Sequence, residues 1–175
     1  MEEQSHIPNS WERINLGSDK LKHFFVRHLD RIYMAKLHLV SKLSLLLEEV
    51  QFAALGKAME ETVSNVGEQI VRMQLIYTML DAEYSEGSIK GLSGLVEDAF
   101  ESIAEHEGEP ALQDLSIIFY LQNIESVEMA SFQILQMAAA QLEQQQVAKL
   151  LKENYEQAKA DRNLLLLISS KYMAG

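Results

Sequence analysis

Apolar residues recur every three or four positions over most of the chain, which is the period of one face of an α-helix. This spacing predicts five helices, over residues 18–49, 52–81, 90–106, 110–142 and 145–172. Gly108 and Pro110 suit the end of the third helix and the start of the fourth, because glycine tolerates a left-handed cap and proline fits a first helical turn. Ser18 or Asp19 is expected to cap the first helix.

Four of these helices have about 28 to 32 residues, which makes each of them about 45 Å long. The links from the first to the second helix and from the fourth to the fifth are very short, so each pair must be antiparallel. The sequence therefore predicts an all-α, ferritin-like antiparallel four-helix bundle with one long crossover that contains a short extra helix. The bundle is expected to cover residues 18–175, and residues 1–17 to form an N-terminal arm or short lead helix whose Trp11 packs on it.

The apolar stripes are interrupted at one level of the predicted bundle. The residues that stand there are Lys36 in the first helix, Thr62 and Asn65 in the second, Glu125 and Glu128 in the fourth, and Ala158 in the last. A buried carboxylate is costly unless it is paired, bound to a metal or protonated. Three interpretations follow: an ion pair from Lys36 to one of the two glutamates in place of a metal, a metal site on those glutamates, or glutamates partly exposed at a helix edge.

Composition narrows the classes of function. The chain carries 15 Lys and Arg against 26 Asp and Glu, a net charge of −11, which argues against binding to nucleic acid or to an anionic membrane. The absence of cysteine excludes disulfides and thiolate chemistry. A His-Glu-x-x-His motif, a phosphate loop and a nucleophile elbow are also absent. No apolar run suits a membrane span and the first residues do not resemble a signal peptide, so a cytoplasmic location is expected.

Several stretches carry a resemblance to a known family. They are residues 24–35, 69–72, 91–99, 124–132 and 148–153, within about residues 18–172. The chain resembles the YciE/YciF-like family of bacterial ferritin-like proteins. Members of that family typically read Tyr-x-Ala-Glu in the first helix, where this chain has Tyr33-Met-Ala-Lys36.

The resemblance implies a dinuclear metal centre of which this chain keeps little. The glutamate of the first helix is replaced by Lys36, and the Glu-His-Tyr-Glu motif of the third long helix falls on residues 125–128, where only Glu125 and Glu128 match. The family's histidine and glutamate in the second helix fall on Thr62, Ser64 and Asn65. In the last helix Glu156 remains, but Gln157 and Ala158 follow it. The resemblance therefore implies a degenerate metal centre with no metal ligands or cofactor expected.

The favoured function is a non-enzymatic ferritin-like bundle protein with a stress-associated role, expected to form a homodimer in the cytoplasm. The alternative is a metal-binding protein of di-iron type, an oxidase or an iron-handling protein, that uses Glu125, Glu128, Glu156 and Glu97 to hold iron or another divalent metal. A third hypothesis is an interaction module for a protein partner, suggested by Leu45 and Leu75, which lie off the main apolar stripes.

Overall fold

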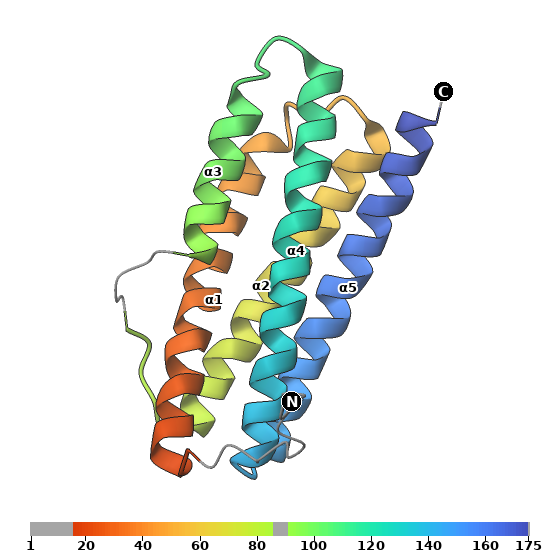
Figure 1. Ribbon diagram of the computed structural model, residues 1–175. Helices are drawn as coiled ribbons and strands as arrows, with labels where there is room; N and C mark the ends of the chain where they lie inside the picture. The colour runs from red at the N-terminus through yellow and green to blue at the C-terminus, as the bar shows by residue number, and fades with distance from the viewer. Residues whose placement is uncertain (1–15, 86–90, 175) are drawn as a thin grey trace, which may run out of the picture.

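The computed structural model of the chain describes residues 16–85 and 91–174, and this part contains five α-helices and no strand (Figure 1). Their bounds are α1 Ser18–Leu46, α2 Ala53–Met79, α3 Leu92–Ala104, α4 Pro110–Gln141 and α5 Gln145–Met173. All five helices predicted from the spacing are confirmed. The N-terminal arm or lead helix and the packing of Trp11 fall on residues 1–15, outside the described ranges.

The four long helices form a ring in the order α1, α2, α5, α4, in which every neighbouring pair runs antiparallel (Figure 1). The crossover between α2 and α4 contains α3, which packs against both α1 and α4. The predicted antiparallel four-helix bundle with one long crossover and a short extra helix is thus confirmed. Within the described ranges, no helix is long and apolar enough to cross a membrane.

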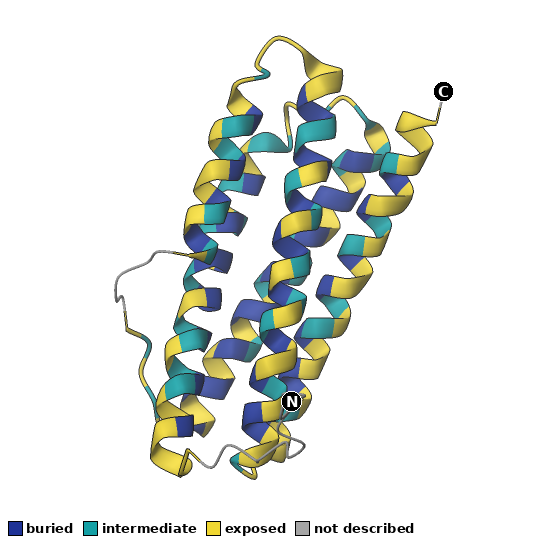
Figure 2. Ribbon diagram, viewed as in Figure 1, coloured by how far each residue is buried: buried dark blue, intermediate teal, exposed yellow. Residues whose placement is uncertain are grey.

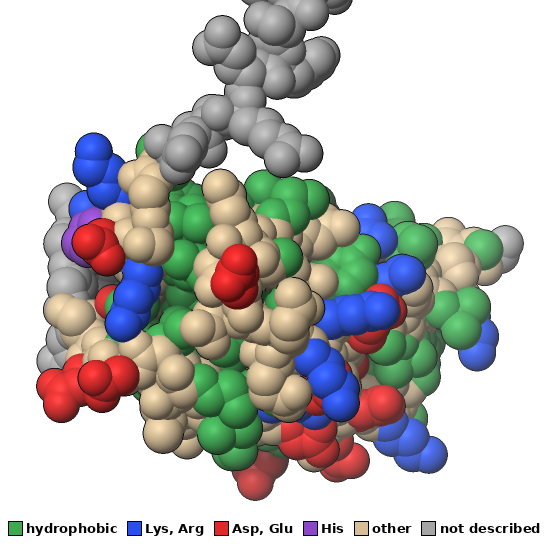
Figure 3. All heavy atoms as spheres, turned by 90° about the horizontal axis from the view of Figure 1, so that it is seen from below, with side chains coloured by type: hydrophobic (Ala, Val, Ile, Leu, Met, Phe, Trp, Pro, Cys, Tyr) green, Lys and Arg blue, Asp and Glu red, His purple; other side chains and the backbone are tan. Residues whose placement is uncertain are grey.

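Each helix turns its apolar stripe toward the axis of the bundle, and its charged side chains face mainly outward (Figure 2). The largest apolar side chains that are fully enclosed come from α1, α2 and α4: Phe25, Leu29, Leu39, Leu43, Leu55, Met59, Met73, Ile76, Ile117, Ile118 and Phe132. Burial of each such side chain contributes about 1.5–3 kcal/mol. At the end of the bundle seen in Figure 3, acidic, basic and apolar side chains lie intermingled at the surface.

The charge pattern of α4 is inverted relative to an ordinary surface helix. This helix of 32 residues contains only three charged side chains, Asp114, Glu125 and Glu128, and all three are buried. Its exposed large side chains are uncharged: Leu112, Phe119, Val127, Ile134 and Met137. A helix that is apolar around most of its circumference is normally covered on more than one side, so the outer face of α4 is a candidate contact surface.

The helix ends follow the sequence signals in part. Gly108 has φ of 90° and Pro110 starts α4, as predicted. The predicted cap of α1 is wrong: Ser18 already lies inside the helix, Gly17 precedes it with φ of 73°, and no side chain caps it. A glycine is favoured at that backbone angle because it has no Cβ.

Asp114 links the start of α2 to α4. No side chain of α2 caps that helix, but one carboxylate oxygen of Asp114 accepts hydrogen bonds from the backbone amides of Gln51 at 3.0 Å and Phe52 at 2.6 Å. Burial raises the pKa of Asp114, and these two amides oppose that rise. Asp114 therefore acts as a cap supplied by a distant helix, which satisfies amides that would otherwise lack a partner.

Candidate functional site

The interrupted level of the bundle is a buried polar centre to which all four long helices contribute. Lys36 from α1, Thr62 from α2, and Glu125 and Glu128 from α4 are at most 1% exposed. Ala158 from α5 is also buried, and Asn65 from α2 is half-buried. The structure thus buries the residues that interrupt the stripes, apart from the half-buried Asn65. The interpretation of Glu125 and Glu128 as partly exposed is wrong, because both side chains are fully enclosed.

An ion pair between α1 and α4 dominates this centre. Lys36 Nζ lies 2.5 Å from Glu128 Oε2, and both side chains are 0% exposed. The same ammonium lies 5.7 Å from the centre of the Phe132 ring, where it faces the negative potential of the aromatic ring. Breaking such a pair on one side leaves an uncompensated buried charge, which is costly.

Glu125 lies one turn before Glu128 and has no charge partner of its own. Neither of its carboxyl oxygens has a hydrogen-bond partner, and Glu128 Oε1 also lacks one. Burial raises the pKa of Glu125 well above its usual value, the negative charge of Glu128 raises it further, and Lys36 opposes the rise. Protonation of Glu125 would supply the missing donor, because a neutral carboxyl group can donate to the free oxygen of Glu128.

Asp161 on α5 belongs to the same centre and was missed from the sequence. It is 2% exposed, and its Oδ1 accepts a hydrogen bond of 2.8 Å from Asn65 Nδ2. Burial raises the pKa of Asp161 to about 6, while the hydrogen bond from Asn65 lowers it. A signal existed: Asp161 continues the three-and-four spacing between Ala158 and Leu165, at a position that the apolar stripe left out.

A second missed polar contact joins α2 to α5 beside the centre. The Arg72 guanidinium donates to Gln157 Oε1 at 2.6 Å and to Asn154 Oδ1 at 3.2 Å. It also lies 3.2 Å from Glu153 Oε2 and 3.1 Å from Glu68 Oε2. These contacts fix the register of α2 against α5 around the buried residues.

Two carboxylates of the alternative ligand set do not reach the centre. Glu156 is exposed on α5, and Glu97 is exposed on α3, where its Oε1 lies 2.8 Å from His38 Nε2. Within residues 16–85 and 91–174, no group of three or more His, Cys, Asp or Glu side chains is placed to hold a metal ion. The carboxyl groups gathered at the centre are therefore those of Glu125, Glu128 and Asp161, with a lysine ammonium already bound to Glu128.

The geometry defines an antiparallel helical bundle whose central polar cluster contains a buried ion pair. The family described as a domain of unknown function, DUF892, matches residues 20–173, and the chain belongs to this family. The protein YciF of Escherichia coli strain K12 is 29% identical over 137 residues, which cover 78% of this chain and 82% of that protein.

Solved structures share the fold. The crystal structure of the E. coli stress protein YciF superposes with a TM-score of 0.81 at 24% identity and covers 88% of this chain and 97% of that chain. A protein named YcfI from Rhodopseudomonas palustris gives a TM-score of 0.75 at 20% identity, with coverage of 87% and 97%. A protein from Xanthomonas campestris gives 0.66 at 14% identity, with coverage of 89% and 97%.

Removal of the Lys36 ammonium should destabilise the bundle. Lys36→Met leaves the Glu128 carboxylate buried without a cation, so the free energy of unfolding in urea should fall by about 3–5 kcal/mol. The double variant Lys36→Met with Glu128→Leu should recover most of that loss, because it replaces the pair by apolar groups. Lys57→Met, at an exposed lysine of α2, is the control and should change stability by less than about 0.5 kcal/mol. Equal losses in the single and double variants would contradict the ion-pair account.

The protonation of Glu125 should appear in the pH dependence of stability. Glu125 loses its proton near pH 4.5 in the unfolded chain and at a higher pH in the folded protein. Between these two pH values the folded state binds more protons than the unfolded state, so the free energy of unfolding falls as the pH rises. Glu125→Gln cannot ionise and should reduce this fall. Asp161 causes a separate fall in the free energy of unfolding between pH 3.8 and about pH 6. This second fall should persist in Glu125→Gln.

The exposed Glu156→Gln is the matched control for this measurement and should retain the full fall. Urea unfolding at a series of pH values from 4 upward gives the comparison. Identical pH profiles for Glu125→Gln and the wild-type protein would show that Glu125 does not hold a proton in the folded state.

Proposed function

We propose that this protein is a non-enzymatic, ferritin-like bundle in which a lysine ammonium replaces the metal of a degenerate dinuclear centre. The observation that carries the proposal is the contact of 2.5 Å between Lys36 and Glu128 at the centre of the bundle. A lysine is a compact positive charge that only donates hydrogen bonds, so it can satisfy a carboxylate where a metal cation otherwise would.

The residues at the centre do not fit a dinuclear metal site. Lys36 places a positive charge within reach of both glutamates and would repel a divalent ion. Carboxylate-bridged centres in bundles draw glutamates from all four helices and histidines from two. Here α2 offers Thr62 and Asn65 in their place, and α5 offers Ala158 and a single carboxyl group, that of Asp161, whose Oδ1 already accepts a hydrogen bond from Asn65. Glu125 binds a metal only after it loses the proton that its burial favours. No step of chemistry at a metal is therefore assigned to this protein.

A stress-associated role is the second part of the proposal. The relative from E. coli is named a stress protein, and it shares 29% of its residues with this chain over most of both proteins. A bundle whose central glutamate is already paired with a lysine is suited to binding or to a structural role, because its fold supplies surfaces rather than a reactive group. The cytoplasmic location stays a prediction from the sequence.

Metal analysis tests the first part of the proposal. After anaerobic loading with ferrous iron and desalting, elemental mass spectrometry should find no stoichiometric metal in the wild-type protein, because Lys36 already neutralises Glu128. Stoichiometric iron would overturn the proposal in favour of the metal-binding alternative. In that case the double variant Glu125→Ala with Glu128→Ala decides whether these two glutamates hold the iron or whether other residues do.

A homodimer is the third part, and the apolar surface at the upper end of α4 and α5 is its proposed contact. Phe119 is 61% exposed and Met173 is 71% exposed, and both line one hollow of about 440 Å³ between α3, α4 and α5. Leu166 lies two turns before Met173 on α5 and is also exposed. In a twofold dimer a patch meets its own copy. Apolar side chains dominate this patch, with Glu105 as an acidic residue of the hollow, so the patch meets less of the repulsion that a net charge of −11 imposes elsewhere.

Substitution of Phe119 should separate the dimer. Phe119→Glu places a charge against its own copy, so light scattering after size exclusion should show the mass shift from two chains toward one, with a dissociation constant raised at least tenfold. Val71→Glu, at a residue 62% exposed on α2, is the control and should leave the mass unchanged. A wild-type monomer at all concentrations, or dissociation by Val71→Glu alone, would exclude this contact surface.

A further inference from the structure

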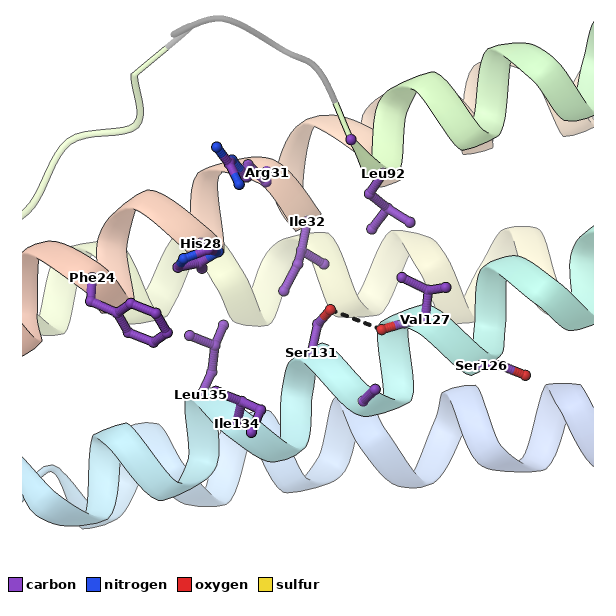
Figure 4. A pocket seen from close by; sticks show the side chains of 12 residues that line it. Phe24, His28, Arg31, Ile32, Leu92, Ser126, Val127, Ser131, Ile134 and Leu135 are labelled. Carbon is purple, nitrogen blue, oxygen red and sulfur yellow. Dashed lines mark hydrogen bonds between the residues drawn. The ribbon is translucent and has the colours of Figure 1, made fainter. Parts of the chain in front are cut away.

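A cavity of about 590 Å³ lies between α1 and α4, below the start of α3 (Figure 4). It exists because α3 has only 13 residues and covers one half of the groove between two helices that are more than twice as long. Small-molecule sites typically have volumes of about 300–1,000 Å³. The cavity therefore has the size of a ligand site, and no residue of the buried ion pair lines it.

The walls of this cavity are apolar and uncharged along α4. Val127, Ile134 and Leu135 face Phe24 and Ile32 of α1 across the space, as Figure 4 shows. Val127 and Ile134 are 43% and 51% exposed, although they are large and apolar. Among the described residues that line the cavity, none is acidic. Such a surface favours a hydrocarbon group over water, because burial removes apolar area from solvent.

The edge of the cavity on α1 is positively charged. His28 lies toward the space between the helices, and Arg31, one turn later, extends from α1 on its solvent side (Figure 4). Burial lowers the pKa of His28, and the positive charges of Arg31 and Arg27 lower it further. In the part of the chain that the structure describes, neither arginine makes an ion pair. Arg31, a cation at the edge of an apolar cavity, is therefore available to an anionic ligand, although the chain as a whole has a net charge of −11.

We propose that this cavity binds a free fatty acid, with the hydrocarbon chain between α1 and α4 and the carboxylate at Arg31. The guanidinium can meet a carboxylate through two parallel hydrogen bonds, and the apolar walls supply the affinity for the chain. A free single-chain acid fits better than a lipid in a membrane, because the acidic protein as a whole is repelled by an anionic membrane surface. The inference is independent of the proposed function, since it uses neither Lys36 nor the glutamates of the centre.

Calorimetry with the full chain tests the site. Dodecanoate should bind at one site per chain, and dodecanol and acetate should bind more weakly, because one lacks the charge and the other lacks the chain. Arg31→Gln should weaken dodecanoate about fivefold at low salt, and added salt should reduce that difference. Lys149→Gln, at an exposed lysine of α5, is the matched charge control and should leave binding unchanged.

Filling the cavity tests its location separately from its charge. Ala130 lines the cavity and is exposed, so Ala130→Phe should fold normally and weaken dodecanoate at least tenfold. Ala140→Phe, at an exposed alanine of α4 outside the cavity, is the control and should bind as the wild-type protein does. The proposal is overturned if dodecanoate does not bind the full chain. That result is expected if other residues of the chain occupy the cavity. Equal effects of the two phenylalanines, equal binding of dodecanol and dodecanoate, or binding only to vesicles of anionic phospholipid would also overturn it.

Discussion

The buried contact between Lys36 and Glu128 is the interaction on which the arrangement of this bundle depends. It joins α1 to α4, two neighbouring helices whose groove is covered by α3 along one half and holds a cavity along the other. An ion pair removed from water adds little net stability, but it strongly penalises any packing that separates its charges. It therefore selects the register in which these two helices meet, while the apolar stripes supply the driving force for the bundle to form.

The same contact accounts for the distribution of protons and charges around it. One lysine faces three carboxyl groups, those of Glu125, Glu128 and Asp161, so it cannot neutralise all of them. Burial shifts the balance toward protonation, which raises the pKa of Glu125 and brings that of Asp161 to about 6. The charges of α4 lie inside and its outer face is left without any. That neutral outer face forms one wall of the cavity and, further along, the proposed contact between two copies.

The sequence predicted the five helices, their order and the level of the polar centre, because apolar spacing reports directly which face of a helix is buried. It also placed Lys36 opposite Glu125 and Glu128, although it could not choose between the two as partner. It missed Asp161, although this residue continues the apolar spacing of the last helix, and it missed Asp114, because the backbone amides that bind Asp114 belong to a segment distant in sequence. The cavity was not predictable, since it arises from the length of α3 relative to its neighbours. The motif of the last helix did not reveal that Glu156 is exposed, because exposure depends on which face of the helix points toward the bundle axis.

Carbon-13 NMR of the glutamate side-chain carboxyl groups tests most directly whether the buried centre is neutralised by Lys36 and a proton on Glu125. Glu125 can be assigned from the resonance that disappears in Glu125→Gln, and its chemical shift reports whether the group carries a proton. As the pH rises through the range in which ordinary glutamates ionise, we predict that Glu125 keeps the chemical shift of a neutral carboxyl group after the exposed glutamates have lost their protons. Ionisation of Glu125 together with the exposed glutamates would contradict this, because the buried carboxylates beside a single lysine would then require a further cation at the centre.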